Sequence, residues 1–198
     1  MKLLLATHNK HKITELKEAL KDSGFEILSL DDFPDMPEVI EDGDTLELNS
    51  LKKAKELFDH TGITTLADDT GLEVEHLNGE PGVYSARWAG EGCTYKDNCE
   101  KLLRELRNVA PDERKASFRC IITLYGKDIF KTTEGVLNGH IIDHYRGSEG
   151  FGYDPVFVPE WHNITLAEMP LNEKNKISHR GLAVKKMVEI IMEMKKAE

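Results

Sequence analysis

Hydrophobic residues in the N-terminal part of the chain follow two different periodicities. The short apolar runs "KLLLAT" at 2–7 and "FEILSL" at 25–30 are typical of buried strands. Between them, apolar side chains recur at helical spacing at Ile13, Leu16, Ala19 and Leu20, and Gly24 is a plausible end for this helix. The pattern therefore predicts a strand, a helix and a second strand in this order.

A second helix and two further strands are expected next. Residues 31–45 are rich in proline and acidic residues, which predicts a loop. The helix that follows is predicted to present one apolar face, formed by Leu48, Leu51, Ala54, Leu57 and Phe58. The apolar residues 63–67 and the alternating residues 71–77 predict strands on either side of an acidic turn that holds Asp68 and Asp69. This succession of strands and helices predicts an α/β fold.

The C-terminal half predicts a hairpin between two helices. In residues 116–126, apolar side chains alternate with polar ones, and residues 129–142 follow after a short connection, which is typical of an antiparallel hairpin. Helical spacing recurs at 95–108 and at 178–196. The glycine-rich residues 146–160 show little regular pattern.

Length and composition fit one domain. The chain has 198 residues, of which 39% are hydrophobic, so we expect a single domain over 1–198. No apolar stretch approaches the roughly 20 residues of a membrane-spanning helix. The apolar run at the N-terminus is also too short for the hydrophobic core of a secretory signal peptide. We therefore expect a cytoplasmic protein without membrane contact. Cys93, Cys99 and Cys120 lack the spacing of a zinc site or a disulfide framework.

The net charge narrows the choice of partner. A formal charge of −10 argues against a nucleic acid polymer, because binding to a phosphate backbone relies on a basic surface. A small phosphorylated ligand remains compatible, since a few basic residues and a divalent cation can reverse the potential within a cleft.

The segment "THNKHK", from Thr7 to Lys12, joins the first predicted strand to the first helix. Backbone N–H groups at a helix N-terminus favour an anion, and Thr7, Asn9 and Lys12 could add polar donors for a phosphate. The segment lacks the glycines of the P-loop and dinucleotide-binding motifs. Taken alone, it is better interpreted as a helix start that Thr7 or Asn9 caps.

Acidic residues form a second candidate group. Glu41, Asp42 and Asp44 lie in one predicted loop, and Asp68 and Asp69 in the acidic turn. Mg²⁺ takes carboxylate oxygens and retains water and substrate phosphates, so two carboxylates from separate loops would suffice. We interpret Asp42 and Asp44 as solvated loop residues. For Asp69 we favour a place in a site, because it follows a buried strand, where α/β sheets bind their ligands.

The segment "GFGYDP" carries two aromatic residues between glycines. Phe151 or Tyr153 could stack on a nucleotide base, and Asp154 could accept a hydrogen bond from a ring N–H. A tightly packed turn explains the same residues equally well.

A basic group in "EKNKISHRG" completes the candidates. Lys174, His179 and Arg180 lie close to the start of the last predicted helix, and alone they indicate only a charged surface. Together with the amides, carboxylates and aromatic loop described above, they indicate a nucleoside triphosphate as the ligand.

Five segments together resemble the inosine triphosphate pyrophosphatase family, which acts on non-canonical purine nucleoside triphosphates. They are "ATHNKHKITEL", "NSLKKA", "ADDTGLEVEHLNGEPGVYSARWAG", "GFGYDPVF" and "EKNKISHRG", in the family's order and at its spacing. The resemblance implies Mg²⁺-dependent hydrolysis of ITP, dITP and XTP to the monophosphate and pyrophosphate. It also implies an α/β fold with an elongated mixed β-sheet flanked by helices, two lobes with a cleft between them, and a homodimer.

The resemblance further implies roles for single residues. Asp69 matches the catalytic proton acceptor and, with Glu41, a metal ligand, and Lys53 matches a lysine that reaches the phosphates. The other implied substrate-binding residues are Thr7, His8, Asn9, Lys10, His11, Lys12, Thr70, Phe151, Gly152, Tyr153, Asp154, Lys174, His179 and Arg180. Thr70 replaces a common serine and keeps its hydroxyl. His8 and His11 stand where glycines are common, which is expected to tune phosphate affinity and not the reaction.

Two alternatives stay open at this point. A pyrophosphatase for modified pyrimidine or canonical nucleoside triphosphates would use the same phosphate chemistry. A nucleotide-binding regulatory module without catalysis would also explain the basic and aromatic residues, although it has no need of a water-activating carboxylate such as Asp69.

Overall fold

The computed structural model describes residues 2–196, and the chain divides into two compact units. Unit 1 consists of the residues up to Asp69, Cys120–Gly135 and the residues from Arg180 onward, and unit 2 consists of Thr70–Arg119 and Val136–His179. The expected single domain and the expected cleft between two lobes stay predictions.

Unit 1 is built on a sheet whose first strands run parallel. Strands β1 (Lys2–Leu5) and β2 (Glu26–Ser29) pair in parallel, and β1 also pairs in parallel with β3 (Thr65–Val74). Strands β5 (Lys115–Gly126) and β6 (Ile129–Ile141) continue the order β2-β1-β3-β5-β6. A two-residue connection joins β5 to β6, which confirms the predicted hairpin, and Asp128 in this turn has a φ of 61°.

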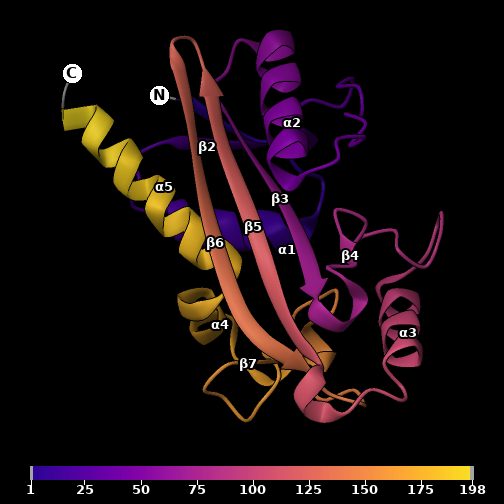
Figure 1. Cartoon of the computed structure of the whole chain (residues 1–198). Coiled ribbons are helices and arrows are strands. Elements are labelled where there is room, and N and C mark those ends of the chain that lie inside the picture. The colour runs from indigo at the N-terminus through magenta and orange to yellow at the C-terminus, as the bar shows by residue number, and fades with distance from the viewer. Residues whose placement is uncertain (1, 197–198) are drawn as a thin grey trace. The chain divides into compact units, whose positions relative to one another are not determined.

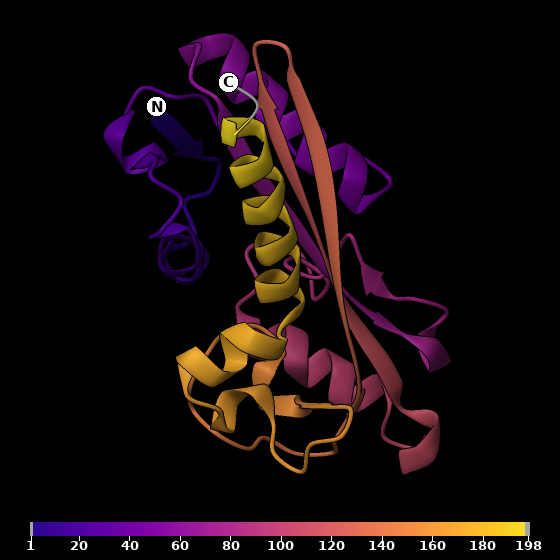
Figure 2. The same cartoon turned by 90° about the vertical axis from the view of Figure 1, so that its left-hand side faces the viewer.

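Helices cover both faces of this sheet. Helices α1 (Lys10–Leu20) and α5 (His179–Lys196) bury their apolar residues on one face, and α2 (Leu46–Thr61) does so on the other. Figures 1 and 2 show α5 and α2 on opposite sides of β5 and β6. Because both faces are covered, neighbouring residues of a central strand can both be buried even though their side chains point in opposite directions.

The buried stripes of α1 and α2 contain polar residues that the apolar periodicity does not predict. Ala19 and Leu48 were expected to be buried but are exposed. Their helices instead bury polar side chains, namely Glu15 in α1 and Asn49, Ser50 and Lys53 in α2. The prediction for Leu48 was wrong because the polar contacts of Asn49, Ser50 and Lys53, described below, turn that side of α2 inward. Ala19 is exposed although Ile13, Leu16 and Leu20 of the same helix are buried as expected.

Strand β3 also differs from the prediction. The acidic turn between residues 63–67 and 71–77 does not exist, since β3 runs without interruption from Thr65 to Val74 and contains Asp68 and Asp69. The strand continues because buried cations on each side satisfy these carboxylates, so no turn is needed to bring them to solvent. The prediction that Asp69 lies beyond the carboxyl end of its strand was therefore wrong.

Unit 2 adds antiparallel pairs to the parallel ones of unit 1. The short strand β4 (Pro81–Gly82) pairs with β3, and β7 (Phe157–Pro159), in the region without a predicted pattern, pairs with β6. Helices α3 (Tyr95–Glu105) and α4 (Leu171–Ile177) complete this unit. The 3-10 helices of the described chain are Leu30–Asp32, Glu75–Leu77, Pro111–Glu113, Asp154–Val156 and Leu166–Glu168.

A single cluster of apolar side chains fills unit 2. It combines residues of α3, such as Leu102, with strand residues such as Phe118 and Phe157, whose rings lie 4.7 Å apart. Parallel and antiparallel pairs therefore coexist in a sheet flanked by helices, which confirms the predicted α/β fold with a mixed sheet. No helix within residues 2–196 is long and apolar enough to span a membrane.

Candidate functional site

The central feature of unit 1 is the pair of consecutive carboxylates in β3. Leu66 packs in the cluster with α1 and α5, whereas Ala67 packs in the cluster with α2. By the alternation of a strand, Asp68 therefore faces α1 and α5, and Asp69 faces α2. Both residues are buried, with exposed fractions of 1% and 6%. Both carboxylates can be buried because helices cover both faces of the sheet.

Asp68 lies at the centre of a buried network of charges. Its Oδ2 atom is 2.9 Å from Lys12 Nζ and 3.3 Å from Arg180 Nε. Arg180 Nη1 also contacts Glu15 Oε2, so two carboxylates and two cations balance each other. Burial raises the pKa of Asp68, but the charges of Lys12, Arg180 and Lys53 outweigh this effect and hold the pKa below its ordinary value. Asp68 is therefore a stably charged residue.

Asp69 has different neighbours and a different ionisation. Lys53 Nζ lies 3.7 Å from Asp69 Oδ1 and 2.7 Å from Glu41 Oε1, and it donates to the backbone oxygen of Asp68 at 2.6 Å. Burial raises the pKa of Asp69 above its ordinary value, and Glu41 adds to this rise, although Lys53 opposes it. Burial lowers the pKa of Lys53, but Asp69 and Glu41 outweigh burial and the net pKa is raised. The adjacent carboxylates thus differ in their affinity for a proton.

Helix α2 presents two further polar residues to this region that the sequence interpretation did not single out. Asn49 Oδ1 accepts a hydrogen bond from Gly43 N at 2.8 Å, which ties the loop before α2 to the helix. Ser50 Oγ donates to Ala67 O at 3.1 Å and lies 2.9 Å from Thr123 Oγ1. A signal existed in the sequence, because Asn49 and Lys53 are one helical turn apart and share a face with buried Leu46 and Leu57.

The loop after β1 forms the start of α1. Asn9 caps the helix, since its Oδ1 accepts from His11 N at 3.0 Å and from Lys12 N at 3.3 Å. Thr7 Oγ1 accepts from Asn9 N at 3.1 Å and closes the preceding turn. The capping interpretation is therefore confirmed. The side chains of His8, Lys10 and His11 are exposed, whereas the Lys12 side chain reaches the buried carboxylate of Asp68. A phosphate site in this segment stays a prediction.

In unit 2, the aromatic loop and the following basic residue meet. Asp154 Oδ2 accepts from Phe151 N and from Lys174 Nζ, each at 2.8 Å, and both charged side chains are buried. The Lys174 ammonium lies 5.1 Å from the centre of the Phe151 ring, and the Tyr95 ring lies 5.8 Å from it. Phe151 itself is half-buried. Tyr95, which the sequence interpretation missed, thus borders this aromatic site.

The remaining predicted residues of unit 2 are held by internal contacts. Tyr153 is buried and its hydroxyl donates to Ser85 O at 3.0 Å, so it is a packed residue. Gly152 has a φ of 63°, a conformation that favours glycine, and its carbonyl oxygen accepts from Cys99 Sγ at 3.3 Å. Thr70 is half-buried at the first position of this unit.

His179 and Arg180, adjacent in sequence, are both almost fully buried. The His179 ring stacks on the Phe118 ring at 4.6 Å with an interplanar angle of 12°. Arg180 is 2% exposed and has the two buried carboxylate partners described above. The structure therefore places Arg180 in the charge network around Asp68, and a direct contact between Arg180 and a substrate stays a prediction.

Two carboxylates of unit 1 suit a hard divalent cation. Glu41 and Asp69 both lie beside the Lys53 ammonium, which shows that this position favours positive charge. Oxygen ligands from one or two carboxylates, completed by water and substrate phosphates, are what Mg²⁺ takes in nucleotide enzymes. Within residues 2–196, no group of three or more His, Cys, Asp or Glu side chains is placed to hold a metal ion.

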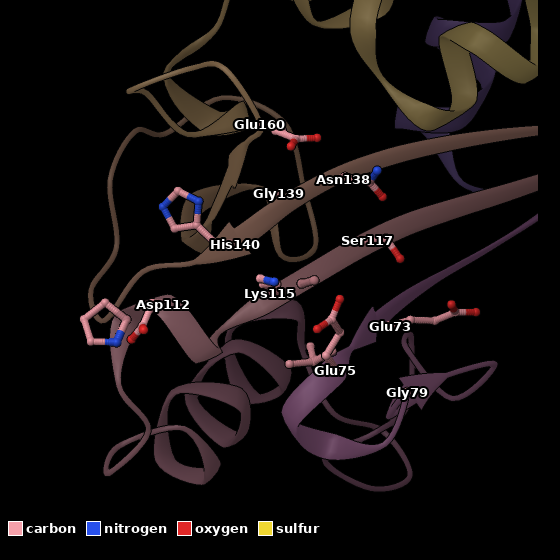
Figure 3. A pocket seen from close by; sticks show the side chains of 13 residues that line it. Glu73, Glu75, Gly79, Asp112, Lys115, Ser117, Asn138, Gly139, His140 and Glu160 are labelled. Atoms are coloured by element: carbon pink, nitrogen blue, oxygen red, sulfur yellow. The ribbon is translucent and has the colours of Figure 1, made fainter.

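A separate concave pocket of about 910 Å³ lies in unit 2 (Figure 3). It contains none of the predicted site residues. Four carboxylates line it, those of Glu73, Glu75, Asp112 and Glu160, against one lysine, Lys115. Because this lining is mostly acidic, the pocket is a poor site for a triphosphate.

Known proteins resemble this chain over nearly its full length. The model of the Ham1 family matches residues 3–190. The chain is 48% identical over 192 residues to the dITP/XTP pyrophosphatase of Thermoanaerobacter sp. (strain X514), with 97% of each chain covered. It is 50% identical over 184 residues to the dITP/XTP pyrophosphatase of Geobacter sulfurreducens, with 92% of each chain covered.

The backbone of this chain also resembles the backbones of solved structures. The Ham1 protein of Staphylococcus aureus has a TM-score of 0.88 and 36% identity, and the match covers 98% of this chain and 100% of that chain. A HAM1 protein from Coxiella burnetii has a TM-score of 0.90 and 36% identity, with 98% and 99% covered. Sequence and backbone comparisons therefore point to the same group of proteins.

Proposed function

Because the chain belongs to the Ham1 family, we propose that it hydrolyses the non-canonical purine nucleoside triphosphates ITP, dITP and XTP to the monophosphate and pyrophosphate. The curated relatives are named dITP/XTP pyrophosphatases. The observation that carries the proposal is the buried Asp69 carboxylate, which lies beside Lys53 and Glu41. Such an enzyme would remove deaminated purines from the nucleotide pool.

Asp69 is the residue that we assign to water activation. Its raised pKa makes this carboxylate a better proton acceptor than an ordinary aspartate. Asp68 is a poor candidate for the same task, because its neighbouring cations stabilise its charge and lower its proton affinity. We assign Asp68 the role of holding Lys12 and Arg180 in place.

Lys12 and Lys53 are the residues that would counter the charge of the phosphates. Each ammonium is already held in a defined position by carboxylates, Lys12 by Asp68 and Lys53 by Glu41. Fixed cations of this kind stabilise a pyrophosphate leaving group without reorganisation during the reaction. Thr7 and Asn9 lie in the same loop as the α1 N-terminus, whose dipole also favours phosphate.

We further propose that the enzyme depends on Mg²⁺ and that Glu41 and Asp69 hold it. When bound, the cation would polarise phosphate oxygens and neutralise part of their charge. The contribution of the protein is to supply two carboxylate oxygens near Lys53 and to leave the remaining positions to water and substrate.

We assign the base to residues of unit 2. The half-buried Phe151 ring offers a surface for stacking, and Lys174 and Asp154 fix the loop that carries it. Hypoxanthine and xanthine carry a 6-oxo acceptor where adenine has an amino donor, so a donor such as His179 or a backbone N–H near Tyr153 would select for them. A site built around such a bond rejects bases that leave it unpaired.

The assembly and location of the protein are part of the proposal. Resemblance to the inosine triphosphate pyrophosphatases supports a homodimer that acts in the cytoplasm, where the nucleotide pool is found. Sedimentation of the purified chain would give its oligomeric state.

The proposal is tested by pyrophosphate release from dITP, XTP, dGTP and dATP, each with Mg²⁺ and with a chelator. We expect metal-dependent turnover of dITP and XTP well above that of dGTP and dATP. Preferred turnover of canonical or modified pyrimidine nucleotides would instead support the first alternative. Absence of turnover by the folded protein, together with nucleotide binding, would contradict the proposal and favour a regulatory module.

A further inference from the structure

We propose that Asn49 is a positioning residue that holds Glu41 and Asp69 in their working arrangement; this inference rests on the proposed function. Asn49 lies in the first turn of α2, one turn before Lys53, and none of its surface is exposed. Its side chain has an acceptor and a donor, and the two ends serve different neighbours.

The acceptor end fixes the loop that carries Glu41. Asn49 Oδ1 accepts from Gly43 N at 2.8 Å, two residues after Glu41. A β-carbon at Gly43 would lie 2.8 Å from the same oxygen, so only glycine permits this close approach. Asp42, next to Glu41, also pairs with Lys52 of α2, but this ion pair is exposed and such pairs contribute little. Glu41 itself pairs with Lys53 of the same helix.

The donor end of Asn49 is buried as well. In the described part of the chain, the Asn49 Nδ2 atom completes no hydrogen bond of ordinary geometry. Asn49 is nevertheless one of the neighbours that favour the charged form of the Asp69 carboxyl. A buried N–H₂ group costs free energy unless it is bonded, so a retained donor here implies a task at this position. We assign it the task of orienting the Asp69 carboxylate.

Two substitutions distinguish the role of the Asn49 acceptor from that of the donor. Asn49→Leu has nearly the same size but loses both acceptor and donor, whereas Asn49→Asp keeps an oxygen for Gly43 and loses the N–H₂ group. Ser50→Ala is the matched control, because Ser50 is the next residue, is equally buried and bonds Ala67 and Thr123 instead. Each variant is compared with the wild type for kcat and KM with dITP and for thermal stability.

A second measurement does not depend on activity. Hydrogen exchange of the Gly43 amide, followed by NMR in protein without nucleotide or metal, reports the bond to Asn49 directly. We expect fast exchange in Asn49→Leu and slow exchange in the wild type, Asn49→Asp and Ser50→Ala. We expect kcat to fall about 10–100-fold in both Asn49 variants, as is typical when a residue supporting metal ligands is lost, with a smaller change in KM.

The outcomes distinguish this inference from the proposed function. Ser50→Ala is expected to lower stability alone, so an equal loss of kcat in Ser50→Ala would overturn a specific role for Asn49. Wild-type kcat in Asn49→Asp would overturn the role of the donor, and unchanged Gly43 exchange in Asn49→Leu would overturn the role of the acceptor. If the wild type itself fails to hydrolyse dITP, the proposed function fails, while Gly43 exchange still decides whether Asn49 fixes the loop.

Discussion

Asp68 and Asp69 are neighbours in β3, yet helices on opposite faces of the sheet hold their side chains. Lys12 of α1 lies 2.9 Å from Asp68 Oδ2, whereas Lys53 of α2 lies 3.7 Å from Asp69 Oδ1. The pKa of Asp68 is lowered and the pKa of Asp69 is raised. Two neighbouring titratable groups whose surroundings shift their pKa values in opposite directions often have different roles in a site. Here we assign Asp68 a structural role and Asp69 a chemical one.

The first prediction concerns the chemical role of Asp69. Asp69→Asn keeps the shape of the side chain and removes the proton acceptor, so we expect turnover of dITP to fall by about 10²–10⁴-fold. The fold should remain intact, as circular dichroism would show. Asp59→Asn, which removes an exposed carboxylate of α2 paired with Lys55, is the control and should retain activity. Near-normal turnover by Asp69→Asn would refute the assignment.

The second prediction is that Asp69→Asn stabilises the protein without nucleotide and metal. Burial raises the pKa of Asp69 in the folded state, so its protonated form contributes stability below the unfolded pKa, and this contribution is lost as pH rises through the folded pKa. Asparagine resembles the protonated form at every pH. Urea unfolding should therefore show a gain for the variant at neutral pH that shrinks in acid. An equal gain at both pH values would contradict a cause in ionisation.

Asp68→Asn is predicted to have the opposite effect on stability. The cations around Asp68 lower its folded pKa, so its charge contributes stability above the unfolded pKa that is lost as pH falls through the folded pKa. The substitution leaves Lys12 and Arg180 short of a buried partner, at a cost of about 3–5 kcal/mol. Urea unfolding at neutral pH should show this loss, and the difference from wild type should decrease in acid. A loss of activity without a loss of stability would argue for a chemical role instead.

The sequence predicted the element order of unit 1 and most of the buried side of α1, but not the rotation of α2. Apolar spacing identified α1 and α2, since a helix that packs on a sheet repeats its buried side chains every turn. It placed Ala19 and Leu48 on the buried side because it counts only apolar residues. Helix α2 instead buries Asn49, which bonds Gly43 six residues earlier, and α1 also buries Glu15, whose partner Arg180 lies 165 residues away. Apolar periodicity reveals neither of these polar contacts.

The sequence identified many residues of the candidate site, but it predicted their arrangement in space less well. Asp69 was singled out because it follows an apolar run, and it is indeed buried among cations. That β3 continues past Asp69 could not be foreseen, because it depends on Lys12 and Arg180 reaching Asp68 from helices at the two ends of the chain. These ion pairs join residues that are far apart in the chain, so the local sequence pattern does not predict them.

The fourth prediction concerns Glu41 as a metal ligand. Glu41→Gln keeps the length of the side chain but removes one of the two charges beside Lys53, so Mg²⁺ should bind more weakly. We expect the Mg²⁺ concentration for half-maximal activity to rise at least about tenfold, which corresponds to about 1.4 kcal/mol. Asp42→Asn removes the adjacent, exposed carboxylate that pairs with Lys52 and is the matched control. Equal shifts in both variants would indicate a general effect of loop charge.

The last prediction addresses the recognition of the base. The Phe151 ring is half-buried, with Tyr95 at 5.8 Å and the Lys174 ammonium at 5.1 Å, so its position is fixed before a ligand arrives. Stacking of a base on an aromatic ring contributes about 1–3 kcal/mol, so Phe151→Ala should raise the KM for dITP by the corresponding factor. The value of kcat should change little, because the ring takes no part in bond breaking.

Phe130→Ala provides the control for this variant. Phe130 is a phenylalanine of β6 with 56% of its surface exposed and no place among the predicted site residues, so its loss should leave KM unchanged. Steady-state kinetics with dITP and with inorganic triphosphate would separate base binding from phosphate binding, since only the nucleotide can stack. If Phe151→Ala weakens both ligands equally, the ring supports the Asp154–Lys174 pair and does not receive the base.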